Sequence, residues 1–102
     1  MHDARIFRKS VLYLIGATRG GPMRLRIISE LMKKPLNPNM LAQMLGVDYK
    51  TIVHHLDVLR KNNWVVKDGK KYAEVFMLAF TEEQKQVFQA ILAEIGKKAL
   101  KG

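Results

Sequence analysis

Apolar residues recur at helical spacing along most of the chain, and short breaks rich in glycine, proline or polar residues separate them into segments. Spacings of three and four residues indicate amphipathic helices, whereas short runs of β-branched and aromatic residues indicate strands. The pattern predicts helices over about residues 4–17, 22–33, 38–45, 49–62 and 82–100, with two short strands between the last two helices.

Several of these predicted helix ends carry residues that cap helices. Asn37 and Asp48 directly precede the third and fourth helices, where their side chains accept from free N–H groups. Gly46 ends the third helix, because glycine adopts the left-handed conformation at low cost. Residues 81–84 read Thr-Glu-Glu-Gln, which is the pattern of a capping box. Asp3 is a candidate cap for the first helix.

The two strands are predicted over residues 64–67 and 72–76, which are rich in valine and aromatic residues. Asp68 and Gly69 lie between them and favour a type I′ turn, because both central positions of that turn need a positive φ. We therefore predict a β-hairpin with Lys67, Lys70 and Lys71 at its tip.

The order of elements is helix, helix, short helix, tight turn, helix, hairpin, helix. Because the turn at 46–48 is too short for antiparallel packing, the third and fourth helices are expected to cross steeply as a helix-turn-helix. The fourth helix then projects its polar face into a major groove, with the hairpin beside it as a wing. We predict a mainly α winged helix-turn-helix fold with a small β-hairpin wing. Residues 1–102 would form one domain, with a DNA-binding core at 22–78 and dimerisation helices at 1–20 and 81–102.

Charge and composition narrow the function. The chain has 102 residues, a formal net charge of +9 and a pI of about 10.1, which is typical of a protein with a polyanion as partner. Charge alone fits an inert basic surface equally well, so the order of elements decides between the two. The lack of cysteine excludes disulfides and thiolate metal sites. We find no glycine-rich phosphate loop, no Ser-His-Asp arrangement, no signal peptide and no membrane span. We expect a cytoplasmic, nucleoid-associated protein that is not an enzyme and needs no cofactor or metal.

Candidate DNA contacts follow from the predicted geometry. Residues near the start of a recognition helix reach base edges, and we assign this role to Tyr49, Lys50, Thr51, Val53 and His54. Phosphate contacts, which contribute affinity but little sequence choice, are assigned to Arg60, Lys61, Lys67, Lys70 and Lys71.

Other polar residues near this face receive structural interpretations. His55 is expected to be a structural side chain, hydrogen-bonded beside the core. Asp57 would repel phosphate, so it either accepts from a cytosine or pairs with Lys61 four residues later, and we favour the pair. Arg24 and Arg26 lie mostly off the apolar stripe of the second helix and are interpreted as solvated surface.

The segment 39–65, NMLAQMLGVDYKTIVHHLDVLRKNNWV, resembles the ArsR-type winged helix-turn-helix family of prokaryotic transcriptional regulators. The family pattern "LA..LG.....V..HL..L...GLV" is met at Leu41, Ala42, Leu45, Gly46, Ile52, His55, Leu56, Leu59 and Val65. Asn63 and Trp64 replace its usual Gly-Leu. The family often senses metals through cysteine pairs on its third helix. Residues 40–45 hold none, and adjacent residues His54 and His55 diverge too far to bind one ion.

The resemblance implies a homodimeric repressor of transcription. The apolar residues of the first helix cover more than one face, so this helix either is central or packs on a second subunit. We predict a dimer interface built from Phe7, Val11, Leu14, Ile15, Phe88, Ile91, Leu92 and Ile95. Two recognition helices about 34 Å apart would then read a pseudo-palindrome in double-stranded DNA. A protein-interaction module and an architectural DNA-binding module are the alternatives, and the sequence names no small-molecule effector.

Overall fold

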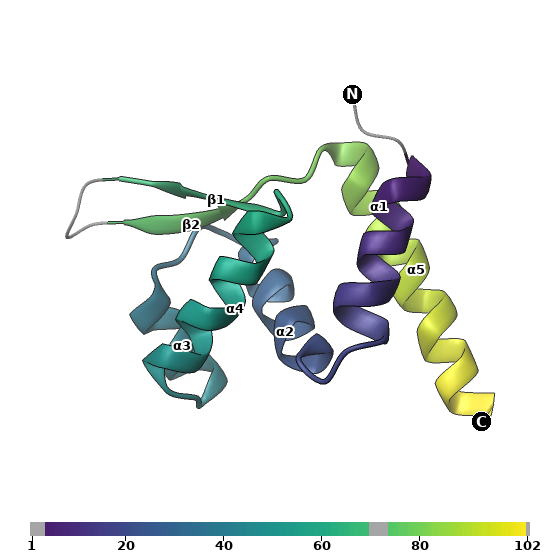
Figure 1. The fold of residues 1–102 in the computed structure, drawn as a ribbon, viewed down its shortest axis with the longest axis horizontal. Coiled ribbons are helices and arrows are strands. Elements are labelled where there is room, and N and C mark those ends of the chain that lie inside the picture. The colour runs from purple at the N-terminus through teal and green to yellow at the C-terminus, as the bar shows by residue number, and fades with distance from the viewer. Residues whose placement is uncertain (1–3, 70–73, 102) are drawn as a thin grey trace. The chain divides into compact units, whose positions relative to one another are not determined.

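The computed structural model describes residues 4–69 and 74–101 of the chain (Figure 1). It consists of helices, one two-stranded antiparallel sheet and a π-helical segment, in the order α1, η1, α2, α3, α4, β1, β2, α5. The chain divides into two compact units, one formed by Met1–Gly21 with Phe80–Gly102 and the other by Pro22–Ala79. The predicted mainly α winged helix-turn-helix fold is confirmed.

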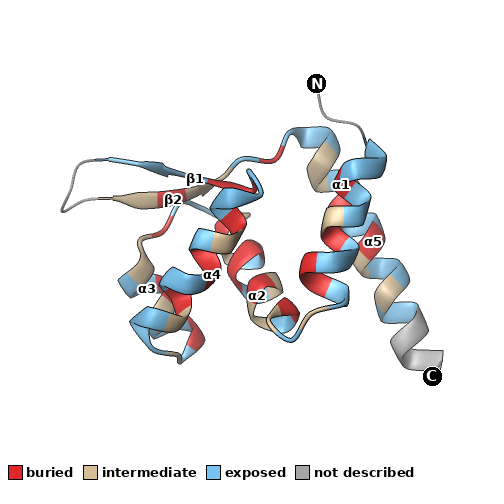
Figure 2. Ribbon diagram, in the orientation of Figure 1, coloured by how far each residue is buried: buried red, intermediate tan, exposed pale blue. Residues whose placement is uncertain are grey.

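The unit of residues 22–79 contains the helix-turn-helix. Its helices are α2 (Gly21–Leu31), α3 (Pro38–Leu45) and α4 (Tyr49–Lys61), and α3 packs against α4. Buried residues, red in Figure 2, occupy one side of each helix. Because the apolar stripes repeat every three to four residues, each helix contributes one face to a common core. The fully buried members of this core include Ile27, Ile28, Leu36, Leu41, Ile52, Leu56, Leu59, Trp64 and Val65.

The predicted caps around α3 and the turn are confirmed. Asn37 Oδ1 accepts from the Met40 N–H at 2.8 Å, and Asp48 Oδ1 accepts from the Thr51 N–H at 2.7 Å. Gly46 has φ 69°, the left-handed conformation that ends α3. These local bonds place α4 immediately after α3 with a fixed change of direction.

The end of α4 uses asparagine where a glycine would be expected. Asn63 has φ 62°, the single positive φ among the non-glycine residues that the structure describes. The Trp64 N–H donates to Leu59 O at 2.9 Å, and the Asn63 N–H donates to Arg60 O at 3.0 Å. This pair of bonds is a Schellman motif, and asparagine is the residue after glycine that best tolerates its left-handed position.

The hairpin has a different register from the predicted one. β1 (Val65–Asp68) pairs with β2 (Val75–Leu78), so Asp68 lies opposite Val75 and belongs to the strand rather than to a two-residue turn. Gly69 does have a positive φ, of 102°. β2 ends two residues later than the predicted strand of 72–76. Within β2, Phe76 is buried and exchanges both backbone hydrogen bonds with Leu36, a pairing between distant segments. Tyr72 and Ala73 lie outside the described residues.

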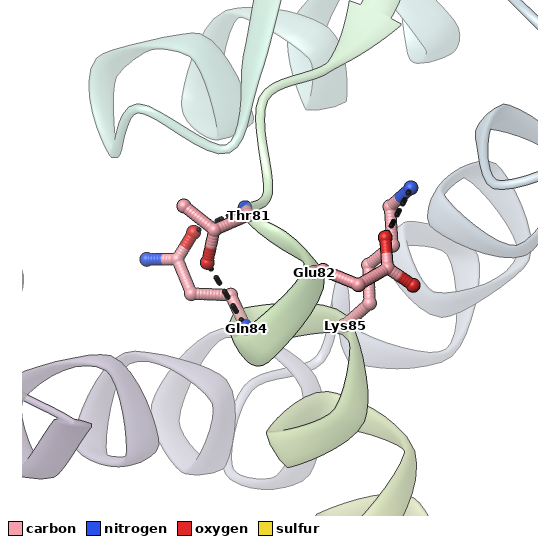
Figure 3. A network of polar contacts seen from close by, with 4 residues as sticks. All are labelled: Thr81, Glu82, Gln84 and Lys85. Atoms are coloured by element: carbon pink, nitrogen blue, oxygen red, sulfur yellow. Dashed lines mark hydrogen bonds and ion pairs between the residues drawn. The ribbon is translucent and has the colours of Figure 1, made fainter.

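The other unit is formed by the two ends of the chain. The first predicted helix is α-helical only over α1 (Ala4–Val11) and continues as the π-helical η1 (Leu12–Gly16). α5 (Glu82–Lys101) begins with the predicted capping box: Thr81 Oγ1 accepts from the Gln84 N–H at 3.1 Å, and Gln84 Oε1 accepts from the Thr81 N–H at 2.9 Å (Figure 3). Lys85 and Glu82 form an ion pair beside it. Asp3, the candidate cap of α1, lies outside the described residues.

α1 packs against α5 around an aromatic cluster. The Phe7 and Phe80 rings meet edge to face at 5.0 Å between centroids, and Phe80 and Phe88 lie 5.5 Å apart. Arg8 and Glu94 join the same two helices by an ion pair of 2.8 Å. Edge-to-face packing and burial of three phenylalanines make this cluster the main stabilising contact between α1 and the start of α5.

Most residues assigned to the dimer interface are buried within the single chain. Phe7, Val11, Leu14, Ile15, Phe88 and Ile91 are buried, while Leu92 and Ile95 are half-buried. The apolar side chains that stay exposed on the first helix are instead Ile6 (68%), Tyr13 (64%) and Leu12 (39%). The predicted interface residues are therefore largely covered within the single chain, and the role of these helices in dimerisation stays a prediction.

Candidate nucleic-acid interface

The two sides of α4 differ sharply in burial. Ile52, Leu56 and Leu59 are fully or almost fully buried in the core of residues 22–79. Four of the five residues assigned to base contacts, Tyr49, Lys50, Val53 and His54, are exposed, and Thr51 is half-buried. Because these four exposed residues all lie in the first two turns, α4 presents an open leading face of the kind that reaches into a major groove.

Asp48 fixes the start of this face. Hydrogen bonds from the hydroxyl and the backbone N–H of Thr51 lower the pKa of the Asp48 carboxyl below its usual value. The carboxylate is therefore charged at neutral pH and engaged in capping, which stabilises the first turn of α4. Thr51 therefore stabilises the start of α4 through its hydrogen bonds to Asp48. Its assignment as a base contact remains a prediction.

On the opposite side of α4, His55 is buried and contacts a buried arginine. Its Nδ1 lies 3.3 Å from a guanidinium nitrogen of Arg24, and each residue is less than 10% exposed. Burial, reinforced by the positive charges of Arg24 and His54, lowers the pKa of His55. The imidazole is therefore neutral at pH 7, and its Nδ1 is available to accept from Arg24. The predicted structural role of His55 is confirmed.

The interpretation of Arg24 as solvated surface is wrong. It is buried because its guanidinium reaches His55, a residue 31 positions later in the chain. The spacing of residues along α2 does not predict the burial of Arg24, because this burial depends on how α2 packs within the unit of residues 22–79. Arg26 is exposed, and its guanidinium donates to Leu45 O at 3.2 Å, so it holds the end of α3.

The assigned phosphate contacts fall into three groups. Arg60 and Lys61 are exposed at the end of α4, and Lys61 Nζ pairs with Asp57 at 3.0 Å, which confirms the favoured pair. Lys67 in β1 pairs with Glu74 at 3.5 Å. Lys70 and Lys71 lie outside the described residues. The ion pairs within residues 4–69 and 74–101 include neither Lys50 nor Arg60. The charge of Lys50 does act on Asp48, where it helps to lower the pKa of the carboxyl.

Among the described residues, no group of three or more histidine, cysteine, aspartate or glutamate side chains is placed to hold a metal ion. None of the helices in the described part of the chain has the length and hydrophobicity needed to cross a bilayer.

The open α4 face, the α3–turn–α4 crossing and the hairpin together define a winged helix-turn-helix protein. Residues 21–67 match the model of the family described as bacterial regulatory protein, arsR family. The resemblance to ArsR-type regulators predicted from the sequence is thus confirmed, over the segment from α2 to Lys67. A comparison with curated protein sequences gives no match.

Solved structures with a similar fold come from several bacteria. Reduced HlyU from Vibrio cholerae N16961 aligns with a TM-score of 0.63 and 22% identity, over 81% of this chain and 84% of that one. The transcriptional repressor BigR from Xylella fastidiosa gives 0.66 and 19%, over 88% and 84%. The homodimeric winged helix-turn-helix DNA-binding domain of Mb0332 from Mycobacterium bovis, a possible ArsR-family regulator, gives 0.66 and 17%, over 98% and 91%. These similarities show that the chain has the winged helix-turn-helix fold.

Proposed function

We propose that this protein is a sequence-specific double-stranded DNA-binding regulator of transcription that inserts α4 into the major groove. The observation that carries the proposal is the open leading face of α4, where Lys50 and His54 are exposed while Ile52 and Leu56 hold the helix in the core. A helix anchored along one side and open along the other can enter a groove without unfolding. The net charge of +9 provides the attraction to phosphate.

The proposal includes a homodimer that acts as a repressor. Two copies would place two α4 helices about one helical turn of DNA apart, about 34 Å, and would read a pseudo-palindromic site. The homodimeric Mb0332 domain and the repressor BigR, which share the fold, support this part by analogy. The bound dimer would act by blocking access of the transcription machinery to the promoter.

A salt titration tests the DNA-binding proposal. Affinity for a duplex recovered by selection from a random pool is measured between about 50 and 200 mM salt. Neutralisation of about 6–10 phosphates by a dimer would lower the affinity by about 10³–10⁵ over this range, because condensed counterions are released on binding.

The selected duplex must also bind at least about 10³ times more tightly than a random duplex of the same length. Equal affinity for the two duplexes would indicate an architectural, sequence-tolerant binder. No binding to either duplex at the lowest salt would contradict the proposed function and favour a protein-interaction module.

A further inference from the structure

The open face of α4 has an apolar edge as well as a charged centre. Tyr49 and Val53 are four residues apart, so they lie one turn apart on the same side of the helix. Their side chains are 51% and 39% exposed. At about 100° per residue, Val53 lies about 60° around the helix from Lys50 and about 20° from Arg60. Val53 thus has a cation one turn before it and another two turns after it, while Asp57, one turn after it and about 40° around the helix, is paired with Lys61.

Folding accounts for only part of this apolar edge. Val53 leaves 39% of its surface exposed, and a β-branched residue is a weaker helix former than alanine, lysine or glutamine. Val53 follows Ile52, which is fully buried, and lies about 100° around the helix from it, at the border between the buried and the open side of α4. The side chain is therefore available for a contact that the single chain does not make.

The surroundings of the edge indicate what covers it. Lys50 and Arg60 flank the apolar pair on a chain of charge +9, which favours a polyanion over an apolar protein surface. Among the groups that base pairs present in the major groove, the C5 methyl of thymine is the apolar one. We infer that the bound DNA half-site carries a thymine whose methyl packs against Val53, with the Tyr49 ring closing the contact on one side. This inference rests on the proposed function, because it needs α4 in the groove.

The expected change in affinity is small, because the contact involves a single methyl group. Burial of one methyl or methylene group changes an affinity by about fourfold, which corresponds to about 0.8 kcal/mol. The contact is therefore large enough to select thymine over uracil at one position, yet too small to decide whether the protein binds DNA at all.

Deoxyuridine, which lacks only the C5 methyl, tests the contact directly. In a duplex obtained by selection, each thymine of one half-site is replaced in turn by deoxyuridine, and affinities are measured for the wild-type protein, Val53→Ser and Val66→Ser. Val66 is a matched control, because it is a comparably exposed valine (47%) in β1 rather than on α4. Both substitutions are on the surface and should leave the free energy of unfolding within about 0.5 kcal/mol of the wild type.

The expected result is a loss of about fourfold at one thymine for the wild type and for Val66→Ser, and no loss at that thymine for Val53→Ser. Two results would overturn the inference while leaving the proposed function intact. In the first, every deoxyuridine duplex binds as tightly as its parent. In the second, the methyl effect persists unchanged in Val53→Ser. Failure of the wild type to bind any duplex would instead overturn the proposed function and the inference with it.

Discussion

Helix α4 and the α1–η1 segment each bury one apolar face, but they expose different side chains. α4 exposes Lys50 and His54 on its leading face, whereas α1–η1 exposes Ile6 and Tyr13, at 68% and 64%. Ile6 and Tyr13 are seven residues apart, about two helical turns, so they share one side of the rod. Burial therefore explains how each segment folds, whereas the exposed side is left for a partner. We propose a polyanion as the partner of α4 and an apolar protein surface as the partner of α1–η1.

The largest expected effect concerns the close packing of Gly21 against the backbone of η1. A Cβ added at Gly21 would lie 2.0 Å from the backbone oxygen of Ile15, so Gly21→Ala forces the backbone of η1 to move. We expect a loss of about 3 kcal/mol or more in the free energy of unfolding, measured by urea denaturation. Gly96→Ala is the control, because nothing lies within 4 Å of its added Cβ, and it should stabilise α5 by about 0.5–1 kcal/mol. Equal stability of the two variants would contradict the packing described for η1.

The second prediction separates folding from self-association. Tyr13→Asp places a carboxylate on the exposed apolar side of α1–η1, which a dimer would have to desolvate. The dimer dissociation constant, measured by light scattering against concentration, should rise by at least about 30-fold, while the circular dichroism of the monomer stays unchanged. Gln43→Asp adds the same group to an exposed position of α3 and should leave the dimer intact. A dimer unaffected by Tyr13→Asp would place its interface elsewhere.

The third prediction concerns the buried face of α4. Burial and the charge of Arg24 lower the pKa of His55, so the unfolded chain takes up this proton at a higher pH than the folded chain. The contribution of neutral, buried His55 to the free energy of unfolding is fully present above about pH 6.5, the ordinary histidine pKa. It is lost as the pH falls below that value. The free energy of unfolding should drop with a slope of at most about 1.4 kcal/mol per pH unit, and His55→Gln should remove this component. The same slope in both proteins would show that His55 titrates alike in the folded and unfolded chains.

The smallest expected effect concerns the end of α4. Asn63→Ala puts a β-carbon without a compensating polar group at φ 62°, which should cost about 1 kcal/mol of stability. Asn63→Gly keeps the Schellman motif and relieves the same strain, so its stability should equal or slightly exceed that of the wild type. The two variants are compared by their urea midpoints. A more stable alanine variant would contradict the left-handed conformation at this position.

The parts of the structure that could be predicted from the sequence depend on local interactions. Asn37, Gly46, Asp48 and the capping box at 81–84 act within a few residues, so their sequence pattern is sufficient to place helix ends. The open face of α4 also follows from spacing alone, because the buried stripe defines its opposite side.

The features that the sequence did not predict depend on distant segments. Arg24 contacts His55, Phe76 pairs with Leu36, and the Phe7 ring packs against Phe80. Each contact spans at least 31 residues along the chain. The apolar residues on several faces of the first helix indicated an additional partner, but their spacing could not distinguish α5 of the same chain from a second subunit.

The central claim, that the leading face of α4 contacts DNA, is tested most directly by a charge reversal at Lys50 and the same reversal at Lys34. Both lysines are exposed, and Lys34 lies in the segment between α2 and α3 rather than on α4. Lys50→Glu should weaken binding to the selected duplex by about 100-fold or more, on the order of 3 kcal/mol. Lys34→Glu should weaken binding less than about tenfold, and equally for selected and random duplexes. The same loss in both variants would mean that binding depends on overall charge alone, and would contradict a role for α4 in reading DNA.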